Sequence, residues 1–283
     1  MELQVQTVEK VTRPENRGPG HSARLVIMPF KVAEHSPFIL MAEDWFVPPA
    51  GFPTHPHRGI ETVTFVLAGR LLHADHTGGA GRLNPGDAQF MTAGGGVMHS
   101  EMPGPDGVQT LQLWLNLPAR LKMTPARYQD MRLADAPALT KDGVEARVYA
   151  GRIGDLAVPH GSTWPLLLID LRLGPGASFA IPIPADNRAF VYVLEGQASL
   201  GADKRTVEAG EVAWAALSPS DGELPVAASS AARMLVFASP VIDEPIVMGG
   251  PFVMNTREEI QEAFDDLRAG RLTDPKPEKA MRL

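Results

Sequence analysis

Two short runs in the first half of the chain carry side chains that bind metal ions: His55-Pro56-His57 and His99-Ser100-Glu101. In a β-strand, residues two apart point to the same face, so each run presents its two outer side chains together. If the runs lie on neighbouring strands, three imidazoles and one carboxylate converge on one point. This donor set suits a divalent metal, and an octahedral ion held by it keeps two open positions for dioxygen and a chelating substrate.

The intervening sequence favours a barrel of hairpins around this point. Residues 61–67 (ETVTFVL) are rich in β-branched and aromatic side chains, and turns are predicted at residues 68–70 and 84–87. Residues 109–117 (QTLQLWLNL) alternate, with leucines on one face. The other face could line a cavity, and it carries Gln112, Trp114 and Asn116.

Composition excludes several classes of function. The chain has 283 residues, no cysteine and a formal net charge of -7, which rules out thiolate ligands and disfavours direct nucleic-acid binding. The N-terminus lacks the apolar core of a secretory signal, and no run is long enough to span a membrane. We therefore expect a cytoplasmic protein.

The second half repeats the first in outline. Gly69 and Gly86 follow strand-like segments in the first half, as Gly196 and Gly210 do in the second. Counting back from Gly196 by the offsets of the two histidines reaches prolines, at 182 and 184, so the second copy has lost the ligands. We predict an all-β chain of two jelly-roll-like barrels in tandem. Their ranges are 1–135, with the metal site, and 145–283, joined by a linker near 130–145.

Residues 256–270 have the pattern of a helix rather than of a strand. The run from Thr256 to Glu259 has the pattern of a helix capping box, apolar residues follow at helical spacing, and Gly270 marks a stop. The second range therefore ends in a short helix, followed by a loose tail over residues 274–283.

Three strings resemble the pirin family of bicupin proteins: residues 55–65 (HPHRGIETVTF), 92–103 (TAGGGVMHSEMP) and 250–260 (GPFVMNTREEI). The resemblance spans nearly the whole chain. It implies two cupin barrels, of which the first holds one non-haem Fe²⁺ and the second holds no metal. Carried over by position, the iron ligands are His55, His57, His99 and Glu101. Other divalent metals, such as zinc or copper, could also bind.

Four further residues have open roles. In cupins generally, a glutamate soon after the first histidine pair is a ligand, and Glu61 occupies about that place. The resemblance to pirins favours Glu101 instead. His73 and His76 are expected at the surface or behind the ligands, and Arg58 could contact a substrate anion or form a surface salt bridge.

The resemblance implies quercetin 2,3-dioxygenase activity, with a flavonol chelated at the iron beside dioxygen. A metal-bound glutamate can act as a general base, and Glu101 is the candidate. Hydrophobic residues that could wall the pocket are Phe52, Phe65, Met91 and Met98. The alternative is an iron-binding, redox-sensitive regulatory protein with a protein partner. In both cases a monomer is expected.

Overall fold

The computed structural model describes residues 1–158 and 161–274, so the predicted tail beyond Asp274 lies outside the described residues. The chain is all-β with a short C-terminal helix, as predicted, and none of the described helices is long and apolar enough to cross a membrane. It forms two compact units. The histidine unit comprises residues 13–133 and 242–283, and the apolar unit comprises residues 1–12 and 134–241.

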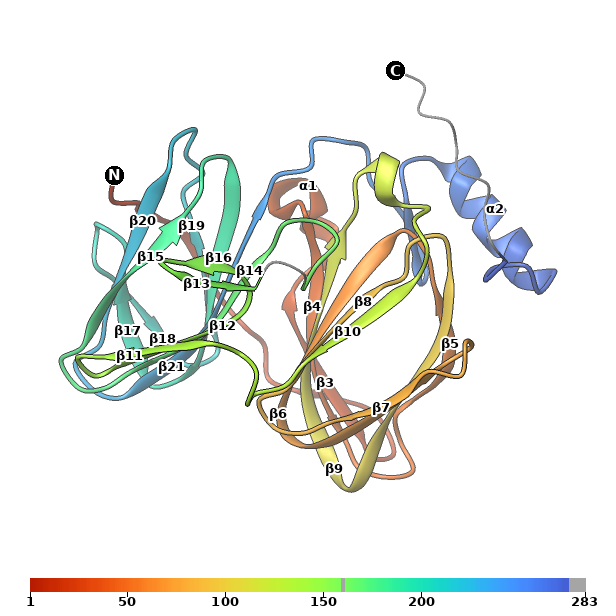
Figure 1. The fold of residues 1–283 in the computed structure, drawn as a ribbon, viewed down its shortest axis with the longest axis horizontal. Helices are drawn as coiled ribbons and strands as arrows, with labels where there is room; N and C mark the ends of the chain where they lie inside the picture. Colours follow the sequence, from red (N-terminus) through yellow and green to blue (C-terminus); the bar gives the residue numbers. More distant parts are fainter. Residues whose placement is uncertain (159–160, 275–283) are drawn as a thin grey trace. The chain divides into compact units, whose positions relative to one another are not determined.

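The histidine unit is built on one nine-stranded sheet with the order β10-β8-β6-β9-β4-β3-β2, to which β5 adds beside β9 and β7 beside β6 (Figure 1). Its strands are β2 (Glu15–Gly18), β3 (His21–Ile27), β4 (Phe38–Phe46), β5 (Phe52–His57), β6 (Ile60–Asp75), β7 (Ala80–Leu83), β8 (Ala88–Thr92), β9 (Val97–Asn116) and β10 (Arg127–Met131). A short helix, α1 (Val32–His35), precedes β4.

The two long strands, β6 and β9, pair along almost their whole length. The start of β6 pairs with the end of β9 (Ile60 with Asn116), and the end of β6 pairs with the start of β9 (Asp75 with His99). The turn predicted at residues 68–70 is instead a bulge within β6, where Gly69 has φ +72 and a Cβ would lie 2.2 Å from the Gly107 carbonyl oxygen. Only glycine fits such a close approach, and the bulge bends the strand without ending it.

The apolar unit repeats this arrangement. Its main sheet has the order β1-β19-β16-β21-β14-β12-β11, with β13 beside β12, and its smaller sheet has the order β15-β20-β17-β18. Its strands are β1 (Val5–Lys10), β11 (Ala138–Lys141), β12 (Val144–Ile153), β13 (Leu156–Val158), β14 (Leu167–Leu173), β15 (Ser178–Ile183), β16 (Asn187–Glu195), β17 (Gln197–Leu200), β18 (Arg205–Glu208), β19 (Glu211–Ala215), β20 (Gly222–Ala227) and β21 (Ala232–Pro240). The order of the main sheet matches β10-β8-β6-β9-β4-β3-β2 of the histidine unit strand for strand. The order of the smaller sheet matches β5-β9-β6-β7. Gly196, with φ +73, sits between β16 and β17 as Gly69 sits within β6.

Each unit is completed by a segment from the other end of the chain. The edge strand β1 pairs with β19 in the apolar unit, whereas the hairpin β22 (Val247–Gly249) and β23 (Phe252–Met254) and the helix α2 (Arg257–Arg268) belong to the histidine unit. The sequence predicts residues 242–283 as part of the second barrel, whereas in the structure the hairpin and α2 group with the histidine unit, where Met98 of β9 packs against Phe252, Ala263 and Leu272.

Helix α2 begins as the sequence predicts. Thr256 caps it by accepting a hydrogen bond from the Glu259 backbone N–H at 3.1 Å, and the Glu259 side chain accepts one from the Thr256 N–H, also at 3.1 Å. Gly270, with φ +69, follows the helix. Local side-chain chemistry therefore fixes where this helix starts, and tertiary packing decides which unit it joins.

Candidate metal centre

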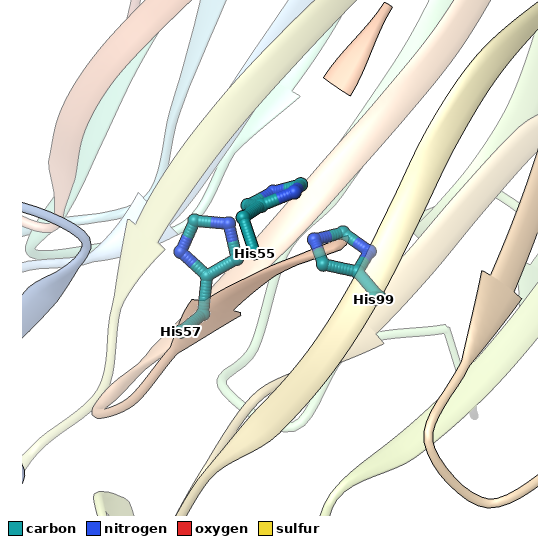
Figure 2. A group of neighbouring side chains, drawn as sticks. All are labelled: His55, His57 and His99. Carbon is teal, nitrogen blue, oxygen red and sulfur yellow. The ribbon is translucent and has the colours of Figure 1, made fainter. Parts of the chain in front are cut away.

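Three histidines converge on the inner face of the histidine unit. On neighbouring strands β5 and β9, His55 lies directly opposite His99, and His57 follows two residues after His55 on the same face. The ring centroids are 4.3 Å apart for His55 and His99, 4.9 Å for His55 and His57, and 5.2 Å for His57 and His99. One nitrogen from each ring lies within 4.8 Å of the others, and Figure 2 shows the rings turned toward one another.

Carbonyl oxygens set the tautomers of the two histidines on β5. His55 Nδ1 lies 2.9 Å from the Pro53 oxygen, and His57 Nδ1 lies 3.2 Å from the Pro251 oxygen. A carbonyl only accepts, so Nδ1 carries the proton in each ring and Nε2 keeps a free lone pair. Burial lowers the pKa of His57 well below its usual value, and burial lowers that of His99 to about 3. His57 and His99 are therefore neutral at pH 7, the form that binds metal.

The three rings fit a metal ion. His57 Nε2 and both ring nitrogens of His99 are buried and have no hydrogen-bond partner within residues 1–158 and 161–274. Buried polar atoms normally find partners, so unpaired lone pairs at one point indicate a missing ligand. Imidazole nitrogens suit iron, zinc, copper and nickel. The three histidines thus form a group able to hold a divalent metal.

Glu101 lies next to this group but outside the set whose ligand atoms all approach within 4.8 Å. Its carboxylate oxygens accept hydrogen bonds from Gln112 Nε2 at 2.7 and 3.0 Å and from the Thr64 hydroxyl at 3.2 Å. The Trp114 indole N–H donates to Gln112 Oε1 at 3.2 Å, which turns the Gln112 amide nitrogen toward Glu101. Burial raises the pKa of Glu101, and the bonds from Gln112 oppose that rise.

The polar face of residues 109–117 therefore lines the site interior. Gln112 and Trp114 lie on this face, and the Trp114 ring meets the His57 ring edge-on at 5.0 Å. Glu61, the other candidate carboxylate, alternates with Thr62 and Thr64 and so lies on the opposite face of β6. There it accepts a hydrogen bond from the Thr92 hydroxyl at 2.7 Å. Glu61 does not continue the face of His55 and His57, because Arg58 and Gly59, with φ +80, separate strand β5 from strand β6.

Arg58 is buried rather than at the surface. It is 1% exposed, its guanidinium donates to the Asp266 carboxylate of α2 at 2.9 Å, and its Nε donates to the Gly95 oxygen at 2.7 Å. The expected surface salt bridge is thus a buried ion pair. Burial on both sides follows from the packing of the C-terminal segment over β5, which could not be foreseen from the residues around Arg58.

Lys122 ties the same segment to the site. Its buried ammonium donates to the Gly59 oxygen at 2.9 Å, the Asn116 side-chain oxygen at 2.7 Å and the Val253 oxygen at 2.9 Å. Burial lowers the pKa of Lys122 to about 7. Gly59 itself leaves no room for a side chain, because a Cβ there would lie 2.0 Å from the Val253 oxygen. No sequence pattern pointed to Lys122.

Of the remaining candidate residues, some lie inside the histidine unit and others do not. His73 is buried, whereas His76 is exposed. Among the proposed pocket walls, Phe52 is half-buried with its ring 5.7 Å from that of His55. Met91 lies opposite Thr62 on the inner face. Phe65 lies on the other face of β6, and Met98 packs against the α2 cluster, so these two do not line the interior.

Comparison with known proteins accounts for both units. The Pirin family model matches residues 11–115, and the model of the pirin C-terminal cupin domain matches residues 168–273. The chain belongs to the pirin family. Both units are accordingly cupins, and the histidines lie in the N-terminal cupin of the family.

Relatives match along most of their length. A pirin-like protein of Solanum lycopersicum is 39% identical over 268 residues, covering 93% of this chain and 91% of the relative. A Pseudomonas aeruginosa protein provisionally named quercetin 2,3-dioxygenase is 45% identical over 232 residues, covering 79% and 80%. The crystal structure of quercetin 2,3-dioxygenase from Acinetobacter baumannii superposes with a TM-score of 0.87 at 31% identity, covering 96% of this chain and 99% of that one.

Proposed function

We propose that the protein is an iron-dependent dioxygenase that cleaves flavonols such as quercetin, with His55, His57, His99 and Glu101 as the metal ligands. The observation that carries the proposal is the convergence of three histidine nitrogens beside the buried carboxylate of Glu101, with those of His57 and His99 buried and unpaired among the described residues. The names of the Pseudomonas and Acinetobacter relatives support the choice of reaction and substrate.

Glu101 serves as the base in this proposal. A flavonol binds through its 3-hydroxyl and 4-keto oxygens, and the hydroxyl proton passes to a carboxylate oxygen of Glu101. Burial raises the pKa of this carboxylate, which makes it a better proton acceptor than an exposed glutamate. Gln112 and Thr64 hold it in place through the hydrogen bonds described above.

Two of the proposed ligands, His57 and His99, already have the protonation state that binds metal. Because His57 and His99 carry no extra proton at pH 7, the metal displaces none from them. Three neutral imidazoles and one carboxylate give a site with Fe²⁺ a net charge of about +1. Bound Fe²⁺ would supply a place where dioxygen and the chelated substrate meet. The overall reaction adds both atoms of dioxygen to the opened ring products and releases one ring carbon as carbon monoxide.

The test is aerobic turnover of quercetin by iron-loaded protein. We expect oxygen uptake that saturates with quercetin, together with carbon monoxide release. A His99→Ala variant and metal-stripped protein should both lack this activity. Absence of turnover by protein holding one iron per chain would exclude quercetin as a substrate.

The second candidate is an iron-binding regulatory protein that contacts a protein partner. One observation favours it: the His57 ring bonds to Pro251, and its neighbour Arg58 bonds to Asp266 of the outer helix α2, so the site is connected to a surface element. A regulator needs no small substrate. Iron-loaded protein without saturable oxygen uptake, but with partner binding that changes on oxidation of the iron, would favour this function.

A further inference from the structure

Two polar groups inside the histidine unit are not used by the chemistry above. His73 is 8% exposed, and neither of its ring nitrogens has a hydrogen-bond partner among the described residues. The buried hydroxyl of Tyr128 also lacks one there. The two rings stack, with centroids 5.8 Å apart and planes inclined by 14°. Asp130 is the acid next to His73, but its oxygen lies 3.8 Å from Nε2, beyond hydrogen-bonding distance.

Strand register places His73 on the same face as the metal ligands. On β6 and β9, His73 pairs with Glu101, and Asp75 pairs with His99. Directly paired residues point to the same side of a sheet. His73 is therefore the diagonal neighbour of His99, with Cα atoms on the order of 7 to 8 Å apart, about the length of one substituted aromatic ring.

Tyr128 lies on the same inner face, on strand β10 of the same sheet. Across four strands, Tyr128 pairs with Met91, Met91 with Thr62, and Thr62 with Trp114. These four side chains form one row on the inner face, and Trp114 at its far end packs on His57. The inner face thus carries a second polar pair, His73 and Tyr128, which adjoins the three histidines on the side of Glu101.

The chemistry of the pair indicates what it binds. A buried hydroxyl and imidazole without partners are costly to maintain, and phenylalanine would fill the apolar contacts that Tyr128 makes with its neighbours. Glycine at position 81 leaves space for the imidazole, because a Cβ there would lie 2.2 Å from His73 Nε2. Together the pair offers a donor and an acceptor beside flat rings, which matches a phenolic hydroxyl on an aromatic ring.

We propose that His73 and Tyr128 bind a phenolic hydroxyl of the substrate that lies beyond its chelating group, on the side of Glu101, so that the site selects polyhydroxylated aromatic compounds over simple chelators. The inference rests on the proposed function for the placement of the chelating end at the three histidines. It assigns to this pair a role in specificity, separate from metal binding.

The experiment compares two flavonols that chelate alike. Quercetin carries additional ring hydroxyls, whereas 3-hydroxyflavone keeps only the chelating hydroxyl and keto group. Binding of each to zinc-loaded protein, which does not turn over, is measured by fluorescence titration. In the Tyr128→Phe variant, we expect the Kd for quercetin to rise about 3- to 10-fold and the Kd for 3-hydroxyflavone to stay within about twofold.

Two further variants distinguish loss of a contact with the flavonol from a general loss of folding. Tyr192→Phe removes a hydroxyl from the core of the apolar unit and should change neither Kd. His73→Phe, a second variant that keeps a ring but loses both nitrogens, should repeat the selective loss for quercetin with unchanged zinc content.

Each other outcome overturns the inference. An equal loss of affinity for both flavonols, or no loss of affinity for quercetin, would mean that His73 and Tyr128 bind only water or have a structural role. Either result would leave the proposed function intact. Failure of unmodified protein to bind either flavonol would instead refute the proposed function, and this inference with it.

Discussion

The two cupins have the same strand order and differ in the side chains that face their interiors. In the histidine unit, β5 and β9 bring His55 opposite His99, whereas the equivalent strands β15 and β20 bring Ile181 opposite Leu224. Ile181, Ile183, Leu224 and Val226 are all at most 3% exposed. The strand order that creates a metal centre in one unit therefore creates an ordinary apolar core in the other, so the scaffold does not depend on the ligands.

The difference has an energetic consequence. Burying an aliphatic side chain contributes about 1.5–3 kcal/mol, and the apolar unit obtains this at each of the four positions. In the histidine unit, the same region buries imidazoles and a carboxylate, which lose hydration and gain full compensation only when a ligand binds. We therefore expect the stability of the histidine unit, but not of the apolar unit, to depend on metal.

Metal removal should give the largest effect. With metal present at about 1,000 times its Kd, the bound state gains about 4 kcal/mol over the stripped state. Hydrogen exchange followed by mass spectrometry should show this loss of protection in β5 and in residues 97–103 of β9. Strands β15 and β20 should be unchanged.

The matched control is His99→Ala, in which chelator should alter exchange in neither unit. An equal loss of protection in β15 and β20 would show that the two cupins unfold as one, and would remove the contrast between them.

The next effect concerns Lys122, which joins the C-terminal segment to the histidine unit. Lys122→Met leaves three buried oxygens without their donor, and we expect a loss of about 3 kcal/mol or more in the free energy of unfolding. Lys141→Met in the apolar unit, where the side chain is 74% exposed, is the control and should cost less than about 0.5 kcal/mol. Urea denaturation measures both free energies. Equal midpoints for the two variants would show that Lys122 does not stabilise the contact between the C-terminal segment and the histidine unit.

His99→Leu makes the histidine unit resemble the apolar one and, near neutral pH, should give the smallest effect. In metal-free protein at pH 7.5 we expect a gain of about 1 kcal/mol, because two unpaired nitrogens are replaced by an apolar side chain. The gain should grow as the pH falls from about 6.5 toward 3. Over this range the unfolded chain binds a proton at His99 while the native protein, with its pKa lowered to about 3, does not.

Thermal unfolding of metal-free wild type and variant from pH 7.5 to 4.5 tests this prediction. His76→Leu, at an exposed position, controls for loss of a histidine. If wild type became more stable than the variant as the pH fell, His99 would be protonated in the native state, which contradicts the prediction.

Much of this arrangement could be predicted because it depends on local pattern. Alternation placed His55 with His57 and the polar side chains of residues 109–117 on one face, and the capping box located α2. The repeat of glycines also indicated two copies of one plan. The count that aligned the copies was off by one, since it reached Pro182 whereas Ile181 and Ile183 are the buried residues of β15.

Other features could not be predicted because they depend on contacts between distant segments. The burial of Arg58 and Lys122 requires the C-terminal segment, which follows the whole apolar unit in sequence. The sequence leaves two places open for His73, near the surface or behind the ligands, and the structure has it buried opposite Glu101. Its position inside depends on the register between β6 and β9, which a bulge at Gly69 shifts. Sequence alternation fixes faces within one strand but not the alignment of two.

The exchange of chain ends also orders events during synthesis. Translation produces the three histidines before residues 134–241 of the apolar unit, whereas the Pro251 carbonyl that orients His57 and the helix that pairs with Arg58 are made after them. A nascent chain that has not yet reached residue 242 therefore holds its histidines without these contacts. The histidine site reaches its folded geometry only once the segment that follows the apolar unit has been made.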